Sequence, residues 1–173
     1  MEHLTRKGQY EDISLTVRPG DIIGLTGLLG SGRTELAMSL FGLNKTQAGV
    51  IRVNGRKTDI KSPMVAKKCG IALLPEDRSR EGLFIERKIK ENISAPLIDD
   101  LCERGIVNCK KENEIAQRYV EELKVRTPSI DTVVGTLSGG NQQKVVISKW
   151  IATNPKVFIM DTPTVGIDIG SKS

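Results

Sequence analysis

The sequence predicts an α/β domain built on a mostly parallel sheet. Short apolar runs that suit buried strands alternate with segments of helical spacing, which is the order that a parallel sheet requires. Two of these runs lead directly into residues whose chemistry suits ligand binding. A glycine-rich loop follows residues 22–26, and Asp161 follows residues 156–160. The 173 residues make up one domain that is large enough to bury a core.

The elements before the middle of the chain follow from local patterns. Residues 13–17 alternate as a strand, residues 18–21 read as a turn, and residues 22–26 suit a buried strand. Helical spacing over residues 35–41 ends at Gly42. Further on, the sequence predicts a strand over 49–55 that runs into an Asn-Gly hairpin turn, a helix from Ser62 to residue 68, and a buried strand over 70–74.

Residues 88–124 differ from the rest because they are polar, rich in Glu and Lys, and helical in period. They predict a helical insert, and we place a helical subdomain at about 88–136 within one domain spanning 1–173. A glycine-rich turn then opens a helix over 141–152, and residues 156–160 form a last buried strand. The insert's amphipathic face consists of Asn113, Ile115, Ala116, Tyr119, Val120 and Leu123.

Composition excludes several classes of protein. Apolar residues make up 38% and charged residues 27%, as in ordinary globular domains. No apolar run approaches the roughly 20 residues of a membrane span, and residues 1–16 lack the apolar stretch of a signal peptide. We therefore expect a soluble domain that reaches a membrane only through a partner.

Charged and sulfur-containing residues give no sign of nucleic-acid or metal binding. The net charge is +5, but the basic pairs at 67–68 and 110–111 have no aromatic neighbours, so we interpret the excess as solvated surface and expect no nucleic-acid partner. We read Cys69, Cys102 and Cys109 as free thiols in a reducing cytosol, because they lack CxxC spacing. His3 is the only histidine, which argues against a histidine-based metal site.

The glycine-rich loop fits the phosphate-binding pattern G-x-x-x-x-G-K-[ST] except at one position. Residues 27–34 read Gly-Leu-Leu-Gly-Ser-Gly-Arg-Thr, so Arg33 stands where the pattern has lysine. Glycines let backbone N–H groups turn toward phosphate oxygens, and the helix that follows adds the positive end of its dipole. Thr34 would place its hydroxyl on Mg²⁺. Alone, the loop is equally consistent with a strand-to-helix turn that only needs glycine.

Two later segments add to this signal. An apolar strand ending in Asp161 is typical of a Walker B element, which positions a carboxylate for Mg²⁺, although many buried strands end in Asp. Residues 137–144 read Leu-Ser-Gly-Gly-Asn-Gln-Gln-Lys and open a helix, whose N-terminus is a second place for an anion. The alternative is a helix capped by Ser138 and followed by flexible glycines.

Residues 137–142 resemble the signature motif of ABC ATPases, and the order of loop, signature and Walker B is the order of that family. The resemblance covers essentially the whole chain. It is closest to the second nucleotide-binding domain of bacterial sugar-import ATPases of the ribose, galactose, xylose and arabinose type, in which a P-loop arginine and an acidic Q-loop residue are usual. The residues that carry it are 27–36, 75–78, 81–83, 137–144 and 161–170.

The resemblance implies a P-loop NTPase fold of the ABC ATPase kind. Its parts would be a RecA-like parallel-sheet core, an N-terminal antiparallel β part and a helical insert. It also implies that the chain is truncated at its C-terminus, because the switch histidine expected beyond the D-loop is not among the 173 residues.

The resemblance further implies ATP and Mg²⁺ as ligands. Glu76 takes the Q-loop position, Thr34 and Asp161 would serve Mg²⁺, and Ser138 and Gly140, with Gly139 between them, would reach the ATP on a partner domain. Residues 165–169, with Asp168, would form the D-loop along that interface. The residues expected to bind ATP are Gly27, Gly30, Ser31, Gly32, Arg33, Thr34 and Glu35.

By the same resemblance, the partners are a second ABC ATP-binding domain in the same full-length chain, transmembrane permease subunits and, indirectly, a solute-binding protein. The location is the cytoplasmic face of a bacterial membrane. The insert and residues 76–93 would face the permease, although a solvated helical face explains their composition equally well.

Two departures from the family pattern predict weak hydrolysis. Thr162 follows Asp161 where the family usually has the glutamate that polarises water, and a threonine hydroxyl cannot accept a proton at neutral pH. Arg33 replaces a compact ammonium with a planar fork, and the two are not interchangeable at a phosphate. We expect negligible ATPase activity from this chain alone. For adenine stacking, Tyr10 is the nearest aromatic, and core packing is its alternative role.

Four alternatives stay open from the sequence. Arg33 could serve as the lysine of a self-sufficient ATPase. The chain could belong to a non-transport ABC protein of DNA repair or translation. It could be a regulatory or structural domain that does not hydrolyse or even bind nucleotide. It could also serve an importer of another solute, such as an autoinducer or a nucleoside.

Overall fold

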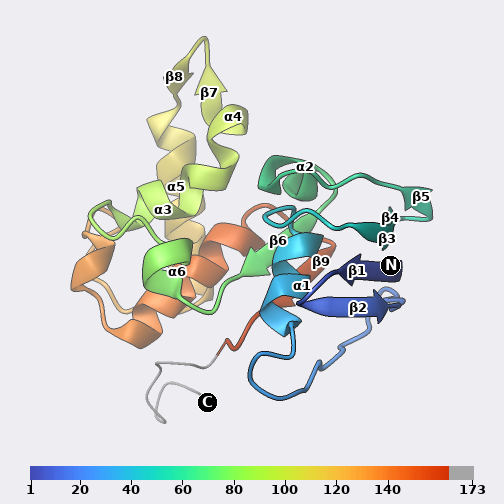
Figure 1. Cartoon of the computed structure of the whole chain (residues 1–173). Coiled ribbons are helices and arrows are strands. Elements are labelled where there is room, and N and C mark those ends of the chain that lie inside the picture. The colour runs from blue at the N-terminus through green and yellow to red at the C-terminus, as the bar shows by residue number, and fades with distance from the viewer. Residues whose placement is uncertain (164–173) are drawn as a thin grey trace. The chain divides into compact units, whose positions relative to one another are not determined.

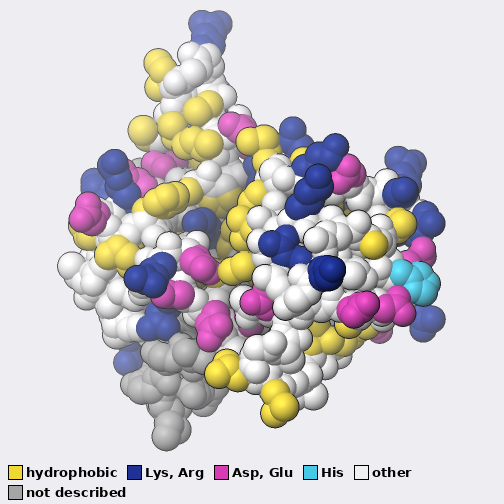
Figure 2. All heavy atoms as spheres, in the orientation of Figure 1, with side chains coloured by type: hydrophobic (Ala, Val, Ile, Leu, Met, Phe, Trp, Pro, Cys, Tyr) yellow, Lys and Arg dark blue, Asp and Glu magenta, His cyan; other side chains and the backbone are white. Residues whose placement is uncertain are grey.

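The computed structural model describes residues 1–163, which form two compact units (Figure 1). The first unit comprises Met1–Leu73 with Lys156–Ile159, and the second comprises Leu74–Pro155 together with the chain from Met160 onward. On the face shown in Figure 2, Lys and Arg side chains are interspersed with Asp and Glu.

A three-stranded antiparallel sheet organises the first unit. Its strands are β1 (Glu2–Arg6), β2 (Tyr10–Ile13) and β3 (Ala48–Val50), in the order β2-β1-β3. Leu4 and Tyr10 from this sheet are buried against Leu36 of helix α1 (Arg33–Leu40). The sheet therefore holds the start of α1, because its apolar face is the surface on which that helix packs.

Local sequence signals correctly predicted the next part of the first unit. The Asn54-Gly55 turn has positive φ at both residues, 52° and 76°, and joins β4 (Arg52–Val53) to β5 (Arg56–Lys57) as a hairpin. The side chain of Ser62 accepts a hydrogen bond from Val65 N and caps α2 (Pro63–Lys68). Helix α1 likewise ends one residue before the predicted Gly42 stop, at the C-cap Phe41.

One parallel strand pair links residues far apart in the sequence, β6 (Ile71–Leu74) and β9 (Val157–Met160). Val157 N donates to Gly70 O at 3.0 Å, and Asp161 N donates to Leu74 O at 2.9 Å, so both strands run in the same direction. Strand β6 is buried throughout, as predicted. Strand β9 forms where predicted but is only half-buried, and Met160 is 49% exposed, because β6 is its only strand neighbour among the described residues.

Two strand predictions near the glycine-rich loop are wrong. Residues 22–26 form an exposed segment without strand pairing, and Ile22 is fully exposed. The predicted strand over 13–17 is instead β2, which ends at Ile13; beyond it, Leu15 N still bonds to Met1 O. An apolar run becomes a strand only when another segment pairs with it, and β6 pairs with β9 instead. The predicted turn at 18–21 does form, with Asp21 N donating to Arg18 O.

The second unit is mainly helical. Helix α3 (Ile89–Ser94) packs against α5 (Cys109–Glu122) and α6 (Gly139–Ile151), and the core of this unit includes Ile89, Ile93, Val145 and Val146. A short hairpin of β7 (Cys102–Glu103) and β8 (Ile106–Val107) projects beyond α4 (Ile98–Leu101) and α5 (Figure 1). The elements are η1 (Arg78–Gly82, a π-helical turn), α3 (Ile89–Ser94), the 3₁₀ turn η2 (Ala95–Leu97), α4 (Ile98–Leu101), β7 (Cys102–Glu103), β8 (Ile106–Val107), α5 (Cys109–Glu122), the 3₁₀ turn η3 (Val134–Thr136) and α6 (Gly139–Ile151).

Helix α5 confirms the helical period of the insert, and α6 begins two residues before its predicted start. Ala116 and Val120 are buried as the amphipathic pattern predicted. Asn113 is the exception: it is exposed and accepts a hydrogen bond from Lys90 Nζ at 3.2 Å, because an amide gains more from a polar partner than from burial. Among the described residues, no helix has both the length and the apolar character needed to cross a membrane.

Candidate nucleotide site

The glycine-rich loop turns directly into helix α1 in the first unit. Ser31 N donates to Leu28 O at 3.1 Å, and Gly30 and Gly32 have φ of 78° and 84°. Gly27 lies against Ser31, since a Cβ at Gly27 would be 2.7 Å from the Ser31 hydroxyl oxygen. These left-handed glycines turn the backbone in the way an anion-binding loop requires.

Gly32 is the residue with the least freedom in the loop. It is the N-cap of α1, and no side chain caps that helix. A Cβ at Gly32 would collide with the carbonyl oxygen of Gln9 and lie 2.9 Å from its carbonyl carbon. The β1–β2 turn therefore packs directly against the end of the loop, and only glycine fits there.

The other predicted phosphate-binding residues lie at the same helix terminus. Arg33, Thr34 and Glu35 occupy the first turn of α1 and are partly buried. Leu28 and Leu29 are 85% and 100% exposed, so the loop is open to solvent on that side. Because the first N–H groups of a helix lack intrahelical partners, this terminus can accept a phosphate.

Asp161 and Thr162 follow β9 in the second unit. Asp161 N is held by Leu74 O, which fixes the backbone where the strand ends. Thr162 has a φ of 41°, an uncommon conformation for a β-branched residue, and its buried hydroxyl oxygen has no hydrogen-bond partner among the described residues. Gln143 of α6 donates to Pro163 O at 2.9 Å and secures the next residue. Such a strained, unsatisfied position is typical of a functional site.

The donor chemistry at these positions suits Mg²⁺. A threonine hydroxyl and an aspartate carboxylate are hard oxygen ligands, which this ion prefers in combination with phosphate oxygens. Thr34 belongs to the first unit and Asp161 to the second. When bound, the ion would neutralise phosphate charge, and each of the two side chains by itself offers an oxygen of the kind that this ion takes as a ligand.

Glu76 lies between β6 and η1 and is exposed. The adjacent Asp77 side chain accepts hydrogen bonds from Ser79 N and Arg80 N and so starts the η1 turn. Farther along, buried Asn92 accepts from Phe84 N at 2.8 Å and donates to Phe84 O and Lys88 O at 3.0 Å. The segment that follows Glu76 is therefore anchored to α3.

The predicted signature residues lie at the start of helix α6, where Ser138 is exposed and Gln143 is buried. Ser138 is exposed and is the N-cap by position, but its hydroxyl does not cap the helix; it accepts a hydrogen bond from Asn141 Nδ2 at 3.0 Å. Ser138 is therefore the N-cap residue of α6, but it makes no side-chain capping bond. Gly139 and Gly140 form the first turn, where uncapped N–H groups can meet an anion.

Sequence reasoning missed Lys149, which lies on α6 and is only 9% exposed. Its Nζ donates to Gly82 O at 3.0 Å and lies 4.9 Å from the centre of the Phe84 ring. Burial lowers the pKa of this ammonium to about 8. The sequence could have predicted its burial, because Lys149 follows Val146 by three positions and Val145 by four and therefore lies on the same, buried face of the helix.

Two other predictions concern Tyr10 and the residues expected to form the D-loop. Tyr10 packs in the core with Leu4 and Leu36 and is 7% exposed, so core packing, not adenine stacking, is its role. The D-loop prediction, residues 165–169 with Asp168, lies outside the described residues.

Comparison with known families decides what kind of protein this is. A family model described as ABC transporter matches residues 10–165. The chain belongs to the ABC transporter family. This confirms the resemblance inferred from the loop, the signature motif and the aspartate-terminated strand.

Within the ABC family, the chain is similar to curated sugar-import ATP-binding proteins. The chain is 46% identical over its whole length to the ribose import ATP-binding protein RbsA 3 of Rhizobium etli, and 45% identical over 166 residues to RbsA of Bacillus subtilis. It is also 45% identical to a putative ribose/galactose/methyl galactoside import ATP-binding protein of Agrobacterium fabrum. The match covers 95–100% of the chain but spans about a third of each relative, 34% in these three cases.

Solved structures confirm the ABC ATPase fold. The ATP-binding cassette MJ0796, in a dimeric post-hydrolysis state with ADP and phosphate, superposes with a TM-score of 0.77 at 22% identity, covering 97% of this chain and 74% of the other. The ADP conformation of MJ1267, an ATP-binding cassette of an ABC transporter, gives 0.76 at 26% identity, covering 98% and 70%. The predicted P-loop NTPase fold class is therefore confirmed.

Proposed function

We propose that this chain is the ATP-binding component of a carbohydrate-import ABC transporter of bacteria. The observation that carries the proposal is the glycine-rich loop, in which left-handed Gly30 and Gly32 lead into the uncapped start of α1. The names of the relatives, ribose import and ribose/galactose/methyl galactoside import, supply the class of solute. The solute itself would be chosen by the permease and a binding protein.

The loop of this chain is proposed to hold Mg-ATP with little turnover. Thr162 stands next to Asp161 and cannot act as a general base at neutral pH. Its buried, unpartnered hydroxyl offers a polar group but no proton acceptor of useful basicity. Arg33 places a broad fork where a compact ammonium would otherwise meet the phosphates. Binding thus survives these changes while the chemical step loses its base.

The signature helix is proposed to complete the ATP site of a second ABC domain. The first turn of α6 presents Gly139 and Gly140 without a side-chain cap, and the neighbouring Ser138 is exposed. An uncapped helix start is attractive to the terminal phosphate of a nucleotide. The partner domain would be the one that hydrolyses ATP.

The segment from Glu76 to Ile93 is proposed to contact the permease from the cytoplasmic face of the membrane. Phe84 is 54% exposed in this segment although its backbone is fixed by Asn92. A rigid backbone that presents an exposed ring suits docking to another protein. The chain would thus reach the membrane through the permease.

Calorimetry with Mg-ATP and a phosphate-release assay test the first part of the proposal. The 173-residue chain is expected to bind Mg-ATP but to release phosphate no faster than its Asp161→Ala variant. Rapid phosphate release that Asp161→Ala abolishes would show a self-sufficient ATPase. No binding at millimolar ATP would show a structural domain.

Mixing with a second cassette tests the role of the signature. A cassette that has the P-loop lysine and the catalytic glutamate should hydrolyse ATP faster when this chain is added. Gly140→Asp should remove that stimulation by placing a carboxylate at the helix start, whereas Thr136→Asp, an exposed change just before the motif, should preserve it. Equal stimulation by both variants would contradict the proposal.

A further inference from the structure

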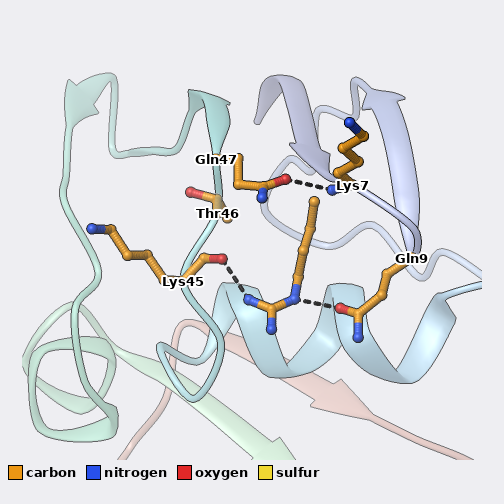
Figure 3. Close-up of a pocket in the computed structure, with 6 residues that line it drawn as sticks. Lys7, Gln9, Lys45, Thr46 and Gln47 are labelled. Atoms are coloured by element: carbon orange, nitrogen blue, oxygen red, sulfur yellow. Dashed lines mark hydrogen bonds between the residues drawn. The ribbon is translucent and has the colours of Figure 1, made fainter.

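A hollow of about 520 Å³ lies on the first unit beside the β1–β2 turn. Figure 3 shows it, with the Lys7 and Lys45 side chains extending outward in different directions and Gln47 directed at the β1–β2 turn. None of the lining residues is aromatic or acidic. They are Arg6, Lys7, Gln9, Lys45, Thr46 and Gln47.

The guanidinium of Arg6 is fixed in this hollow by two hydrogen bonds. Its Nε donates to the side-chain oxygen of Gln9, and its Nη1 donates to Lys45 O at 2.6 Å. No carboxylate of the described residues forms an ion pair with it. Both bonds use edges of the guanidinium, so its flat face stays available for a ligand.

The hollow adjoins the loop proposed to hold phosphates. Gln9, which binds the Arg6 guanidinium, is the residue whose backbone carbonyl abuts Gly32. Gln9 N also donates to Arg6 O at 3.0 Å, which closes the turn between the two strands. A ligand with its phosphates at the start of α1 therefore has the Arg6 turn as an immediate neighbour.

None of the described residues that line the hollow has an aromatic side chain to hold a base. Tyr10, the nearest aromatic in sequence, is buried with Leu4 and Leu36. Phe41 of the same unit is also buried, at 4% exposure. A planar cation is the remaining group in the hollow that can stack on a ring.

We propose that Arg6 is the platform for the purine base of the bound nucleotide. The guanidinium face would lie on the ring, while the amides of Gln9 and Gln47 offer hydrogen bonds at the ring edge or to the ribose. This inference rests on the proposed function, because it concerns the nucleotide whose phosphates that function places on residues 27–34. It adds the residue that recognises the base.

The test compares ATP with inorganic tripolyphosphate, which has the charge but no base. Titration calorimetry with Mg²⁺ measures both affinities for the unchanged chain and for Arg6→Ala and Arg6→Lys. Both variants should bind ATP about five- to tenfold more weakly, the loss expected for one partly exposed stacking contact. Tripolyphosphate should bind within about twofold of its original affinity in the Lys variant, which keeps the charge. Arg56→Ala, an exposed cation on β5, serves as the control and should leave ATP binding unchanged.

Each other outcome overturns the inference. ATP binding that is unaffected in both Arg6 variants shows that the base lies elsewhere. Equal losses for ATP and tripolyphosphate in Arg6→Lys show that residue 6 acts on phosphate. If Arg6→Ala fails to fold by circular dichroism, Arg6→Lys decides alone. If the unchanged chain binds neither ligand, the proposed function itself fails, and this inference fails with it.

Discussion

Replacing Lys149 with methionine should change how the stability of the chain depends on pH. The ammonium is buried on α6, and among the described residues it has a carbonyl oxygen and aromatic rings as neighbours but no carboxylate. Burial lowers its pKa from 10.5 to about 8 because the charged form loses hydration that these neighbours only partly replace. Methionine has a similar length and no titrating group.

The magnitude follows from the two pKa values. A lowered pKa means that the folded chain binds the proton of Lys149 less tightly than the unfolded chain does. Below pH 8, Lys149 is charged in both the folded and the unfolded chain. Burying that charge then lowers the free energy of unfolding by about 3 kcal/mol, because each unit of the pKa shift from 10.5 to about 8 corresponds to about 1.4 kcal/mol. Between pH 8 and 10.5 the unfolded chain binds more protons, so stability rises with pH, and above 10.5 the cost is gone.

Urea denaturation of both proteins between pH 7 and pH 10.5 measures this effect. Trp150, the only tryptophan, lies next to Lys149 and reports unfolding by its fluorescence. The difference in unfolding free energy, native chain minus Lys149→Met, should rise by about 3 kcal/mol over this range, and all other titrating groups cancel in that difference. Lys110→Met, an exposed lysine on α5, should show no such rise. A difference that stays flat within about 1 kcal/mol would refute a buried, charged Lys149.

Three further changes have outcomes set by contacts in the structure. Gly32→Ala should lower the free energy of unfolding by about 2–3 kcal/mol and weaken ATP binding, because both the φ of 84° and the nearby carbonyl oxygen of Gln9 oppose a side chain. Gly24→Ala is the control, since nothing lies within 4 Å of the added carbon, and it should leave both quantities nearly unchanged. Urea denaturation measures the first quantity and titration calorimetry the second. Asn92→Ala should lower the free energy of unfolding, measured by chemical denaturation, by about 3 kcal/mol, because the fully buried Asn92 side chain forms hydrogen bonds with backbone groups that would lose their partner. A loss below about 1 kcal/mol would contradict this. Arg33→Lys combined with Thr162→Glu should raise phosphate release at least about tenfold if the absent base limits turnover, and an unchanged rate would point to another missing part.

Where local chemistry decides a structure, the sequence predicted it well. The Asn54-Gly55 hairpin, the Ser62 cap and the start of α1 after the glycine-rich loop each depend on residues within a few positions of one another. The predicted strand over 22–26 was wrong because strand formation depends on a partner that the run itself does not specify. The same limit explains the half-exposed β9.

The sequence by itself determined the family, since motif spacing and order are one-dimensional properties, and it located the loop, the signature and Asp161. Only the tertiary structure decided which side chains meet. In the folded chain Tyr10 is buried in the core, and the Gln9 carbonyl lies against Gly32. Arg6 is held beside the loop by its hydrogen bond to Gln9, and Lys149 is buried. These outcomes depend on segments that are distant along the chain, and the packing of such segments is not written in any local pattern.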